Sequence, residues 1–351
     1  MPPLKLCVIS GDRSGPFYHD FHLPFMYFQK YGLIDPVAID HLLMEPVKVA
    51  DIIQMQRQYA PESIITLRKM KKQGKPIIAH CDDNVWEIPE NNPAKSTYQG
   101  RTMERFETIL REAHAVTTST PYLKNLCLRF NPNVYIFRNL VEPTIADFKS
   151  PGRDEPDTIR LGWTGTPHHH DDILPIEPLF LQLVQKYPKL RLVFMGYAPP
   201  TVLKQIPRKL WEYYEFVPVD GFYPAFANLD FDIGMAPLAD NGFNKGKTAR
   251  KAQEYAVLSI PMVLAPVITY RDWQHGETCI KPKENTVEEW FKSISWMIEH
   301  PKDREKLANT AHKQVILLND INRYISERAQ VYYDVYKAVK GKEYGSSDQS
   351  I

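Results

Sequence analysis

Short apolar runs alternate with amphipathic segments along the chain, which is the pattern of a parallel α/β protein. The apolar runs have the length of buried strands rather than of helices. In the first half we predict strands at 4–10, 49–54, 76–80, 115–118 and 134–137. Helices are predicted over 21–31, from Pro61, around 103–110 and from Pro121, since proline is favoured at the first helical position.

The second half repeats the alternation without a fixed-period repeat. Its predicted strands are 159–163, 190–195, 214–217, 231–236, 261–265 and 278–280. Its predicted helices are 174–187, 247–258, 287–300, 303–318 and 322–339. Two halves of similar pattern predict two Rossmann-like domains rather than one large sheet.

Residues 142–157 interrupt this alternation. The segment contains three prolines, one glycine and several charges, and no apolar period passes through it. We therefore predict an N-terminal domain over 1–150, a linker that acts as a hinge, and a C-terminal domain over 158–320. A helix over 321–340 and a polar, disordered tail over 341–351 follow.

Composition and charge narrow the function classes. The 351 residues are 43% hydrophobic and 24% charged, and 43 Lys and Arg stand against 42 Asp and Glu. A protein that binds duplex DNA usually has a marked basic excess, so this balance gives nucleic-acid binding no support. The only compact basic run, 68–75, ends a predicted helix, where cations favour the helix dipole.

The cysteines and the hydropathy profile predict a cytoplasmic protein. The four cysteines are far apart and form no Cys-x-x-Cys pair, which fits neither a zinc site nor a disulfide framework. No apolar stretch approaches the ~20 residues needed to span a bilayer. Any membrane contact is therefore expected to be peripheral, at the inner face.

Ligands of open α/β sheets bind beyond the carboxyl ends of the strands, which ranks the segment 162–172 first. Gly165 would let a ligand approach the backbone, and Thr166 offers a hydroxyl and an amide. The alternative is a tight turn with Asp172 as a helix cap. The histidines 168–170 do not predict a metal site, because adjacent histidines rarely converge on one ion.

The segment 243–255 is the second candidate. Lys247, Lys251 and Glu254 are spaced i, i+4 and i+7, which predicts that they share one helical face. Lysines at a helix start oppose the dipole unless an anion binds there. Two lysines and free amides suit a diphosphate, and a carboxylate one turn later suits sugar hydroxyls. The alternative is a solvated face with a Lys–Glu pair.

The first half offers weaker candidates. Asp12 and Arg13 lie in a glycine-rich loop that lacks the Gly-x-Gly-x-x-Gly fingerprint, and His19 follows on the next helix. Asp82 and Asp83 follow the strand 76–80, where paired acids suit substrate hydroxyls, a general base or a divalent ion. Capping and turn formation are the alternative.

Together these segments resemble the family 4 (group 1) glycosyltransferases of the GT-B fold, most closely a bacterial and phage-like branch. The resemblance is clearest from the linker to about residue 303 and weaker before it. It is carried by the following segments: Gly162-Trp163-Thr164-Gly165-Thr166-Pro167-x-His169-x-x-Asp172, 231–238, Phe243-Asn244-x-x-Lys247-x-x-x-Lys251-x-x-Glu254-Tyr255, 259–263, Tyr270-Arg271, Gly276-Glu277, Asp82-Asp83-x-x-Trp86-x-Ile88-Pro89 and 118–120.

The resemblance implies two Rossmann-like domains facing each other across a cleft, with a C-terminal helix that crosses back to the first domain. It implies transfer of a sugar from a nucleoside diphosphate sugar, UDP- or GDP-linked, with retention and with no cofactor or essential metal. Glu254 would hold the ribose, and Lys247 and Lys251 would neutralise the diphosphate. The remaining expected donor residues are Gly165, Thr166, His169, Asn244 and Tyr270. Expected catalytic residues are Lys247, Asp12, His19 and Asp83, and expected acceptor residues are Arg13, Asp82 and Asp83.

Two departures from the family pattern stand out. Many relatives carry Glu-x7-Glu in the donor helix, whereas the earlier position here is Gly246. The branch often has Gly-Cys-Gly and then an arginine in its first loop, whereas this chain has Gly15-Pro16-Phe17 and then His19-Asp20.

Several functions stay open at this point. The acceptor is a surface polysaccharide or glycolipid, or a hydroxymethylated DNA base modified by a phage enzyme, and the near-zero net charge favours the former. Outside this class, Gly246 motivates a non-catalytic nucleotide-sugar-binding protein. A sugar-nucleotide epimerase would share the two-domain plan.

Overall fold

The computed structural model describes residues 2–11, 13–40, 44–153, 155 and 157–341. The chain divides into two compact units: the first comprises residues 1–140, 246–248 and 321–351, and the second comprises 141–245 and 249–320. Residues 141–150 belong to the second unit, whereas the sequence pattern places the boundary at 150. The reason is that Val141 and Ile145 are buried in the core of the second unit.

The first unit is built on a parallel six-stranded sheet. The strand order is β2-β1-β3-β4-β5-β6. From β1 the chain adds β2 on one side of the sheet and then β3 to β6 on the other. The direction of strand addition therefore reverses between β1 and β3, which is the topological switch point. The strands are β1 (Leu4–Ser10), β2 (Ile34–Ile39), β3 (Ile52–Gln56), β4 (Ile77–Cys81), β5 (Ala115–Thr118) and β6 (Val134–Ile136).

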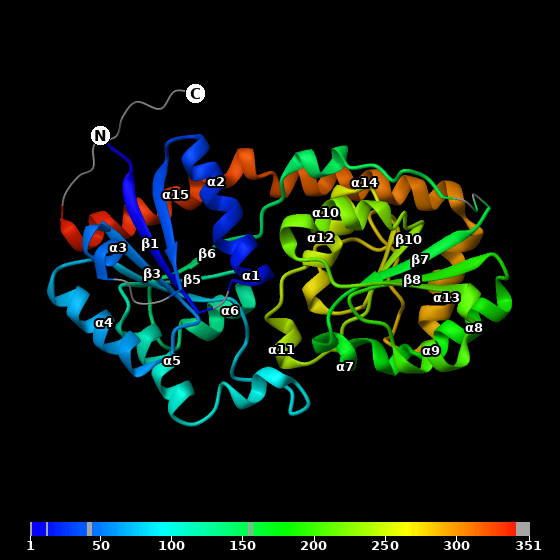
Figure 1. The fold of residues 1–351 in the computed structure, drawn as a ribbon, viewed down its shortest axis with the longest axis horizontal. Helices are drawn as coiled ribbons and strands as arrows, with labels where there is room; N and C mark the ends of the chain where they lie inside the picture. The colour runs from blue at the N-terminus through cyan, green and yellow to red at the C-terminus, as the bar shows by residue number, and fades with distance from the viewer. Residues whose placement is uncertain (1, 12, 41–43, 154, 156, 342–351) are drawn as a thin grey trace. The chain divides into compact units, whose positions relative to one another are not determined.

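Helices cover both faces of this sheet. Figure 1 shows α2 and α15 on one side of the strands and α4 and α5 on the other, and each pair is in contact. The described helices are α1 (Gly15–Phe17), the π-helical turn η1 (Tyr18–His22), α2 (Leu23–Lys30), α3 (Met44–Val49), α4 (Pro61–Lys72), η2 (Pro93–Ser96), α5 (Arg101–Glu112), α6 (Pro121–Cys127) and α15 (Ile321–Lys340).

The last helix, α15, packs on the first unit. The Tyr333 hydroxyl donates to the carbonyl of Leu33 at 2.8 Å. The buried Arg328 guanidinium donates to the carbonyls of Asp20 and Arg138, each at 2.9 Å. The predicted return of the C-terminal helix to the first unit is confirmed.

A buried chain of hydrogen bonds connects α15 to η1 through the sheet. The Tyr332 hydroxyl donates to Gln54 Oε1, and Gln54 Nε2 donates to Thr117 Oγ1 at 2.7 Å. His80 lies 2.9 Å from the same Thr117 oxygen and 3.3 Å from an Asp20 carboxylate oxygen. Because unpaired polar groups are costly inside a protein, this network fixes α15 and η1 against the sheet.

The second unit is built on a parallel five-stranded sheet of order β11-β10-β7-β8-β9. Its first strand in the chain, β7, lies beside its fourth, β10, which is the order of a Rossmann fold with the switch point between them. The strands are β7 (Ile159–Thr164), β8 (Leu190–Met195), β9 (Trp211–Tyr214), β10 (Ile233–Ala236) and β11 (Met262–Leu264).

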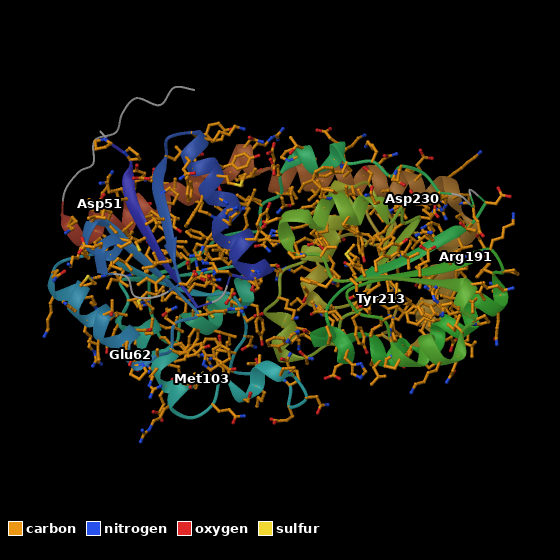
Figure 2. The ribbon with its side chains drawn as sticks, in the orientation of Figure 1. Asp51, Glu62, Met103, Arg191, Tyr213 and Asp230 are labelled. Atoms are coloured by element: carbon orange, nitrogen blue, oxygen red, sulfur yellow. The ribbon has the colours of Figure 1, made fainter. Side chains whose placement is uncertain are left out.

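The helices of the second unit enclose one large apolar core, and Figure 2 shows side chains filling the space between strands and helices. None of the helices in the described part of the chain combines the length and the apolar character needed to cross a membrane. The described helices are η3 (Pro143–Asp147), η4 (Pro167–His169), α7 (His170–Ile173), η5 (Leu174–Ile176), α8 (Pro178–Lys186), α9 (Pro200–Gln205), η6 (Arg208–Leu210), α10 (Val219–Asn228), α11 (Gly242–Lys245), α12 (Arg250–Val257), η7 (Ile268–Tyr270), α13 (Val287–Glu299) and α14 (Pro301–Asn319).

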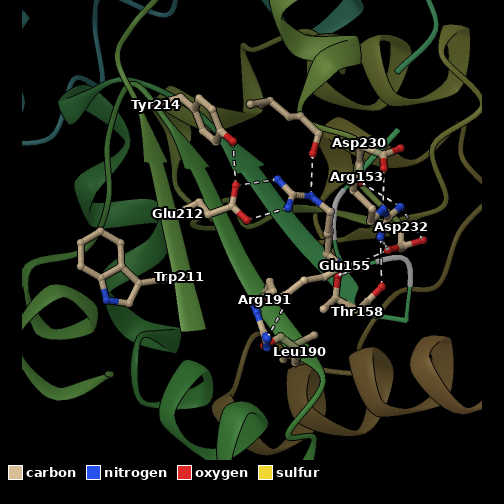
Figure 3. Close-up of polar contacts among 12 residues, drawn as sticks. Arg153, Glu155, Thr158, Leu190, Arg191, Trp211, Glu212, Tyr214, Asp230 and Asp232 are labelled. Atoms are coloured by element: carbon tan, nitrogen blue, oxygen red, sulfur yellow. Dashed lines mark hydrogen bonds and ion pairs between the residues drawn. The ribbon is translucent and has the colours of Figure 1, made fainter. Parts of the chain in front are cut away.

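Ion pairs attach the predicted linker to the second unit. Figure 3 shows the Arg153 guanidinium between the carboxylates of Asp230 and Asp232, with an Nη1–Oδ2 distance of 2.6 Å to Asp232. The same guanidinium donates to the carbonyl of Thr158 at 3.0 Å. These contacts connect Arg153 to Thr158, the residue before β7, and to the loop that carries Asp230 and Asp232.

Several elements differ from the sequence-based expectation. The strand predicted at 214–217 is Trp211–Tyr214, an edge strand whose half-exposed residues give no apolar run. The short strand β2 lies at the other sheet's edge, where Pro36 is tolerated. The strand predicted at 278–280 is reduced to two isolated bridges, from Ile280 to Val263 and from Cys279 to His275. Residues 342–351 of the predicted disordered tail lie outside the described residues.

Candidate functional site

Two glycines shape the loops at the carboxyl ends of β7 and β8. Gly165 donates its N–H to the carbonyl of Met195 at 3.0 Å. A Cβ at Gly165 would lie 2.4 Å from the Trp163 indole, and a Cβ at Gly196 would lie 2.4 Å from the Gly165 oxygen. Packing therefore requires glycine at both positions, whatever binds beyond them.

Asp172 connects the loops on the two sides of the β7/β10 switch point. His169 Nδ1 lies 2.7 Å from one of its carboxylate oxygens. The other oxygen accepts from Asn244 Nδ2 at 2.7 Å and from the N–H of Ala239 at 2.9 Å. The expected donor residues His169 and Asn244 are thus brought together. The amide of Asn244 is engaged within the protein, because its Nδ2 also donates to the carbonyl of Ala239.

The helix α12 begins at Arg250 and not at residue 247, so the predicted face shared by Lys247, Lys251 and Glu254 is wrong for Lys247. Ala249 occupies the N-cap without a side-chain cap, and the first turn carries no acid. Lys251 donates to the carbonyl of Thr164, and its Nζ lies 5.4 Å from the centroid of the Trp163 ring. A cationic, uncapped helix start is unfavourable alone and favours an anionic ligand.

Glu254 is a buried carboxylate in α12. Its side chain is 8% exposed, and it accepts no side-chain hydrogen bond from the described residues. Burial raises its pKa, and the attraction of Lys251 and Arg250 opposes that rise. A buried carboxylate without hydrogen bonds destabilises the folded state, so this group is suited to a ligand that supplies donors.

The Tyr270 hydroxyl lies within electrostatic reach of Asp172 and Glu254. Tyr270 is 3% exposed, and burial raises the pKa of its hydroxyl, with further contributions from Asp172 and Glu254. Thr166 precedes η4, and its hydroxyl lies 3.3 Å from His168 Nδ1. The structure therefore gathers most of the expected donor residues of the second unit around Trp163 and Asp172.

The segment 246–248, which contains Lys247, belongs to the first unit. Thr120 Oγ1 donates to the carbonyl of Gly246 at 3.1 Å, and Asn139 Nδ2 donates to Thr248 Oγ1 at 2.7 Å. A Cβ at Gly246 would lie 3.0 Å from the Asn84 Cβ and 3.0 Å from a Leu123 methyl group. Close packing thus gives a physical reason for glycine at this position.

Substituting Gly246→Glu, which creates a Glu-x7-Glu spacing with Glu254, is expected to lower stability by about 1–3 kcal/mol through overpacking and to leave donor affinity no higher. Chemical denaturation and calorimetric titration with UDP measure the two quantities. Gly221→Glu is the matched control, because its Cβ would meet only a Val217 methyl at 3.2 Å. An unchanged stability together with tighter UDP binding would contradict the packing argument.

The first unit carries an acid cluster at the carboxyl ends of β3 and β4. Arg57 Nη2 lies 2.9 Å from Asp82 Oδ2 and 3.0 Å from Asp83 Oδ2. The Asp82 side chain is 9% exposed, whereas that of Asp83 is 32% exposed. Two of the three expected acceptor residues, Asp82 and Asp83, therefore lie together, and Asp83 is the more exposed of the two. The described residues contain no group of three metal-ligating side chains placed to hold an ion.

The pKa values of Asp82 and Asp83 are shifted in opposite directions. Burial acts against ionisation of Asp82, but the attraction of Arg57 and His80 outweighs it and lowers its pKa. Burial and the charge of Asp82 raise the pKa of Asp83 to about 6, against the opposing attraction of Arg57 and Lys247. Between the ordinary value of 3.8 and about 6, the folded state binds more protons than the unfolded state, so stability falls as pH rises through this window. Such a perturbed acid is typical of functional sites.

The other first-half candidates are more dispersed. Arg13 pairs with Asp40, which follows β2, and its guanidinium lies 4.8 Å from the Phe17 ring centroid. His19 lies in the π-helical turn η1, and its ring is edge-on to that of Tyr18. Asp12 lies outside the described residues.

Three features of the site are not predicted by the sequence pattern. They are the pairing of Arg57 with the two acids, the hydrogen bonds of Asp172 to two loops, and the position of Trp163 among the expected donor residues. The signal for Arg57 was present, because it directly follows a strand at the switch point. The apolar pattern does not reveal Arg57, because the predicted strand ends at residue 54, whereas β3 ends at Gln56.

Comparison with known proteins identifies the fold. No family model and no curated protein sequence matches the chain. Its structure is similar to that of Anabaena HepE in complex with UDP, with a TM-score of 0.65 and 12% identity over 95% of this chain and 100% of that one. It is also similar to sucrose-phosphate synthase from Thermosynechococcus elongatus, with a TM-score of 0.68 and 11% identity over 95% and 100% of the two chains.

A third similar structure is an alpha-glucosyltransferase in complex with UDP-glucose and DNA containing an abasic site. The TM-score is 0.65 and the identity 12%, over 95% of this chain and all of that one. The expected α/β, two-domain GT-B fold is therefore confirmed.

Proposed function

We propose that this protein is a glycosyltransferase that moves a hexosyl group from a nucleoside diphosphate sugar, UDP- or GDP-linked, to an acceptor hydroxyl. The observation that carries the proposal is that the buried Glu254 carboxylate accepts no hydrogen bond from a side chain of the described residues. It lies one turn after a cationic, uncapped helix start beside the switch point. A ligand with a diphosphate and ribose hydroxyls satisfies both features at once.

In this proposal Glu254 accepts hydrogen bonds from the ribose hydroxyls. Lys251 and the N-terminal amides of α12 bind the diphosphate, and Lys247 neutralises the charge that develops on it. The loop 165–169 and Tyr270 border the donor, while Asn244 acts indirectly by holding Asp172. Similar structures solved with UDP or UDP-glucose support the donor class.

The acceptor residues are proposed to lie in the first unit, with Asp83 as the residue that meets the hydroxyl. The bond from the anomeric carbon to the diphosphate oxygen breaks with its electron pair on the diphosphate. The acceptor oxygen bonds to that carbon, and its hydroxyl proton passes to Asp83. At the same sheet edge the Ser119 hydroxyl is buried without a hydrogen-bond partner among the described residues, which suits a second polar contact. Further acceptor-binding or catalytic roles are proposed for four residues of the first unit: Asp12, Arg13, His19 and Asp82.

We further propose retention, no catalytic metal, and an acceptor in polysaccharide or glycolipid assembly in the cytoplasm. The four cysteines, all free and buried, suit a reducing compartment. The alternative acceptor is a hydroxymethylated DNA base. The similar alpha-glucosyltransferase crystallised with DNA favours this second candidate.

The experiment that tests the proposal is a thermal-shift screen of UDP, GDP, ADP, CMP and dTDP sugars, followed by measurement of nucleotide release. We expect one nucleoside diphosphate to stabilise the protein, by about 2.7 kcal/mol at a hundred times its dissociation constant. An epimerase would convert the sugar without releasing the diphosphate. No stabilisation by any of these ligands would refute the donor site.

A further inference from the structure

Arg57 occupies a strained position at the switch point of the first sheet. It directly follows β3, and its φ of 50° lies in the left-handed region that non-glycine residues rarely adopt. Its carbonyl packs against the first loop, because a Cβ at Gly11 would lie 2.5 Å from the Arg57 oxygen. Strain of this kind persists only where the surroundings enforce it, and it is concentrated at functional sites.

The Arg57 guanidinium forms ion pairs with two carboxylates, of which Asp82 is mostly buried and Asp83 is partly exposed. Its Nε and Nη2 both bind Asp82, at 3.0 and 2.9 Å, and Nη2 also reaches Asp83 at 3.0 Å. One buried acid would be enough to neutralise the arginine. Asp82 therefore anchors the guanidinium, which leaves Asp83 oriented by it and still partly open to solvent.

The surroundings of Asp83 contain charges of both signs. Asp82 and Asp20 oppose its ionisation, and Arg57 and Lys247 favour it. The charges of Asp82 and Arg57 also act on the hydroxyl of Tyr98, the former raising its pKa and the latter lowering it. The Tyr98 ring packs edge-on against the Tyr59 ring, with 5.6 Å between the centroids. Of the two cations, Arg57 favours ionisation of Asp83 more strongly than Lys247 does.

We propose that Arg57 is the positioning residue of the acceptor side: it orients the Asp83 carboxylate and keeps it ionised to meet the acceptor hydroxyl, with Asp82 as its fixed anchor. The role of Asp83 in transfer rests on the proposed function. The coupling between Arg57 and Asp83 does not, because it depends only on contacts within the first unit.

Carboxyl-carbon NMR of the full chain labelled at aspartate tests the coupling, with Asp83→Asn to assign the resonance. In the wild type we expect Asp83 to titrate at about 6. In Arg57→Gln the midpoint should rise by about 1 to 2 pH units, and Arg57→Lys, which keeps the charge, should recover most of that shift. Arg68→Gln is the matched control, because it breaks an exposed Arg–Glu112 pair of the same unit. An Asp83 midpoint that is the same in all three arginine variants and the wild type would overturn the proposal.

The pH dependence of UDP release from UDP-glucose tests the functional role. Since the ionised Asp83 is the active form, the acid limb of the profile should move upward with the NMR midpoint. Arg57→Gln should then lose about tenfold in rate at pH 6.5 and recover above pH 8.5. A loss of equal size at every pH would show a merely structural role and overturn the proposal. If wild type neither binds nor cleaves UDP-glucose, that donor is wrong, and the NMR titration still decides the Arg57–Asp83 coupling.

Discussion

Replacing Glu254 with glutamine is expected to weaken UDP binding about 10- to 100-fold while leaving the free protein at least as stable as the wild type. The loss follows from removing a charged partner of the ribose hydroxyls, worth about 1.5–3 kcal/mol. The preserved stability follows from the raised pKa of this buried carboxyl. Above that pKa the ionised group costs folding free energy, and the neutral amide removes the cost.

Calorimetric titration with UDP and thermal unfolding of the free protein measure these two effects. Glu288→Gln is the matched control, because Glu288 is an exposed glutamate of α13 whose side chain is 77% accessible. A glutamine variant that binds UDP as well as wild type would remove Glu254 from the donor site. A variant that is markedly less stable without ligand would show instead that the carboxylate has a structural partner.

Replacing Lys247 with methionine is expected to lower the rate of UDP release from UDP-glucose by about 10²- to 10³-fold. The reason is that the charge on the departing diphosphate grows toward the transition state, so a cation acting there stabilises that state more than the bound donor. KM should therefore change much less than kcat. Lys251→Met should instead weaken donor binding, because Lys251 lies in the first turn of α12.

Steady-state kinetics with both variants separates the two roles. Lys245→Met is the control two residues earlier, where the lysine pairs with Asp240 at 3.5 Å. Equal losses in kcat for Lys245→Met and Lys247→Met would show a general effect of charge in this segment. A Lys247 variant altered only in KM would assign it to ground-state binding.

The sequence predicted the strands best where both faces are buried. The ends of strands β1, β5 and β8 are predicted exactly, because nearly every residue of each strand is buried and polar residues are few in them. Edge strands such as β9 and β2 are half-exposed or contain proline, so no apolar run marks them.

Part of the predicted geometry of the site is wrong. Spacing placed Lys247 on the helix of Lys251, but Gly246 and Thr248 pack on the first unit and delay the helix to Arg250. Local spacing cannot reveal such a tertiary contact. The same holds for Asp172, whose partners Ala239 and Asn244 lie far along the chain.

The return of α15 to the first unit has an entropic consequence. The hydrogen bond from Tyr332 to Gln54 closes a loop of 278 residues. Within the folded second unit, however, the N–H of Val141 donates to the carbonyl of Asn319 at 2.8 Å, which brings the two ends of that unit together. Folding of the second unit thus shortens the effective loop to about 100 residues and lowers its closure cost by about 1 kcal/mol. The second unit therefore acts as an inserted domain with adjacent ends, and its folding helps to complete the first.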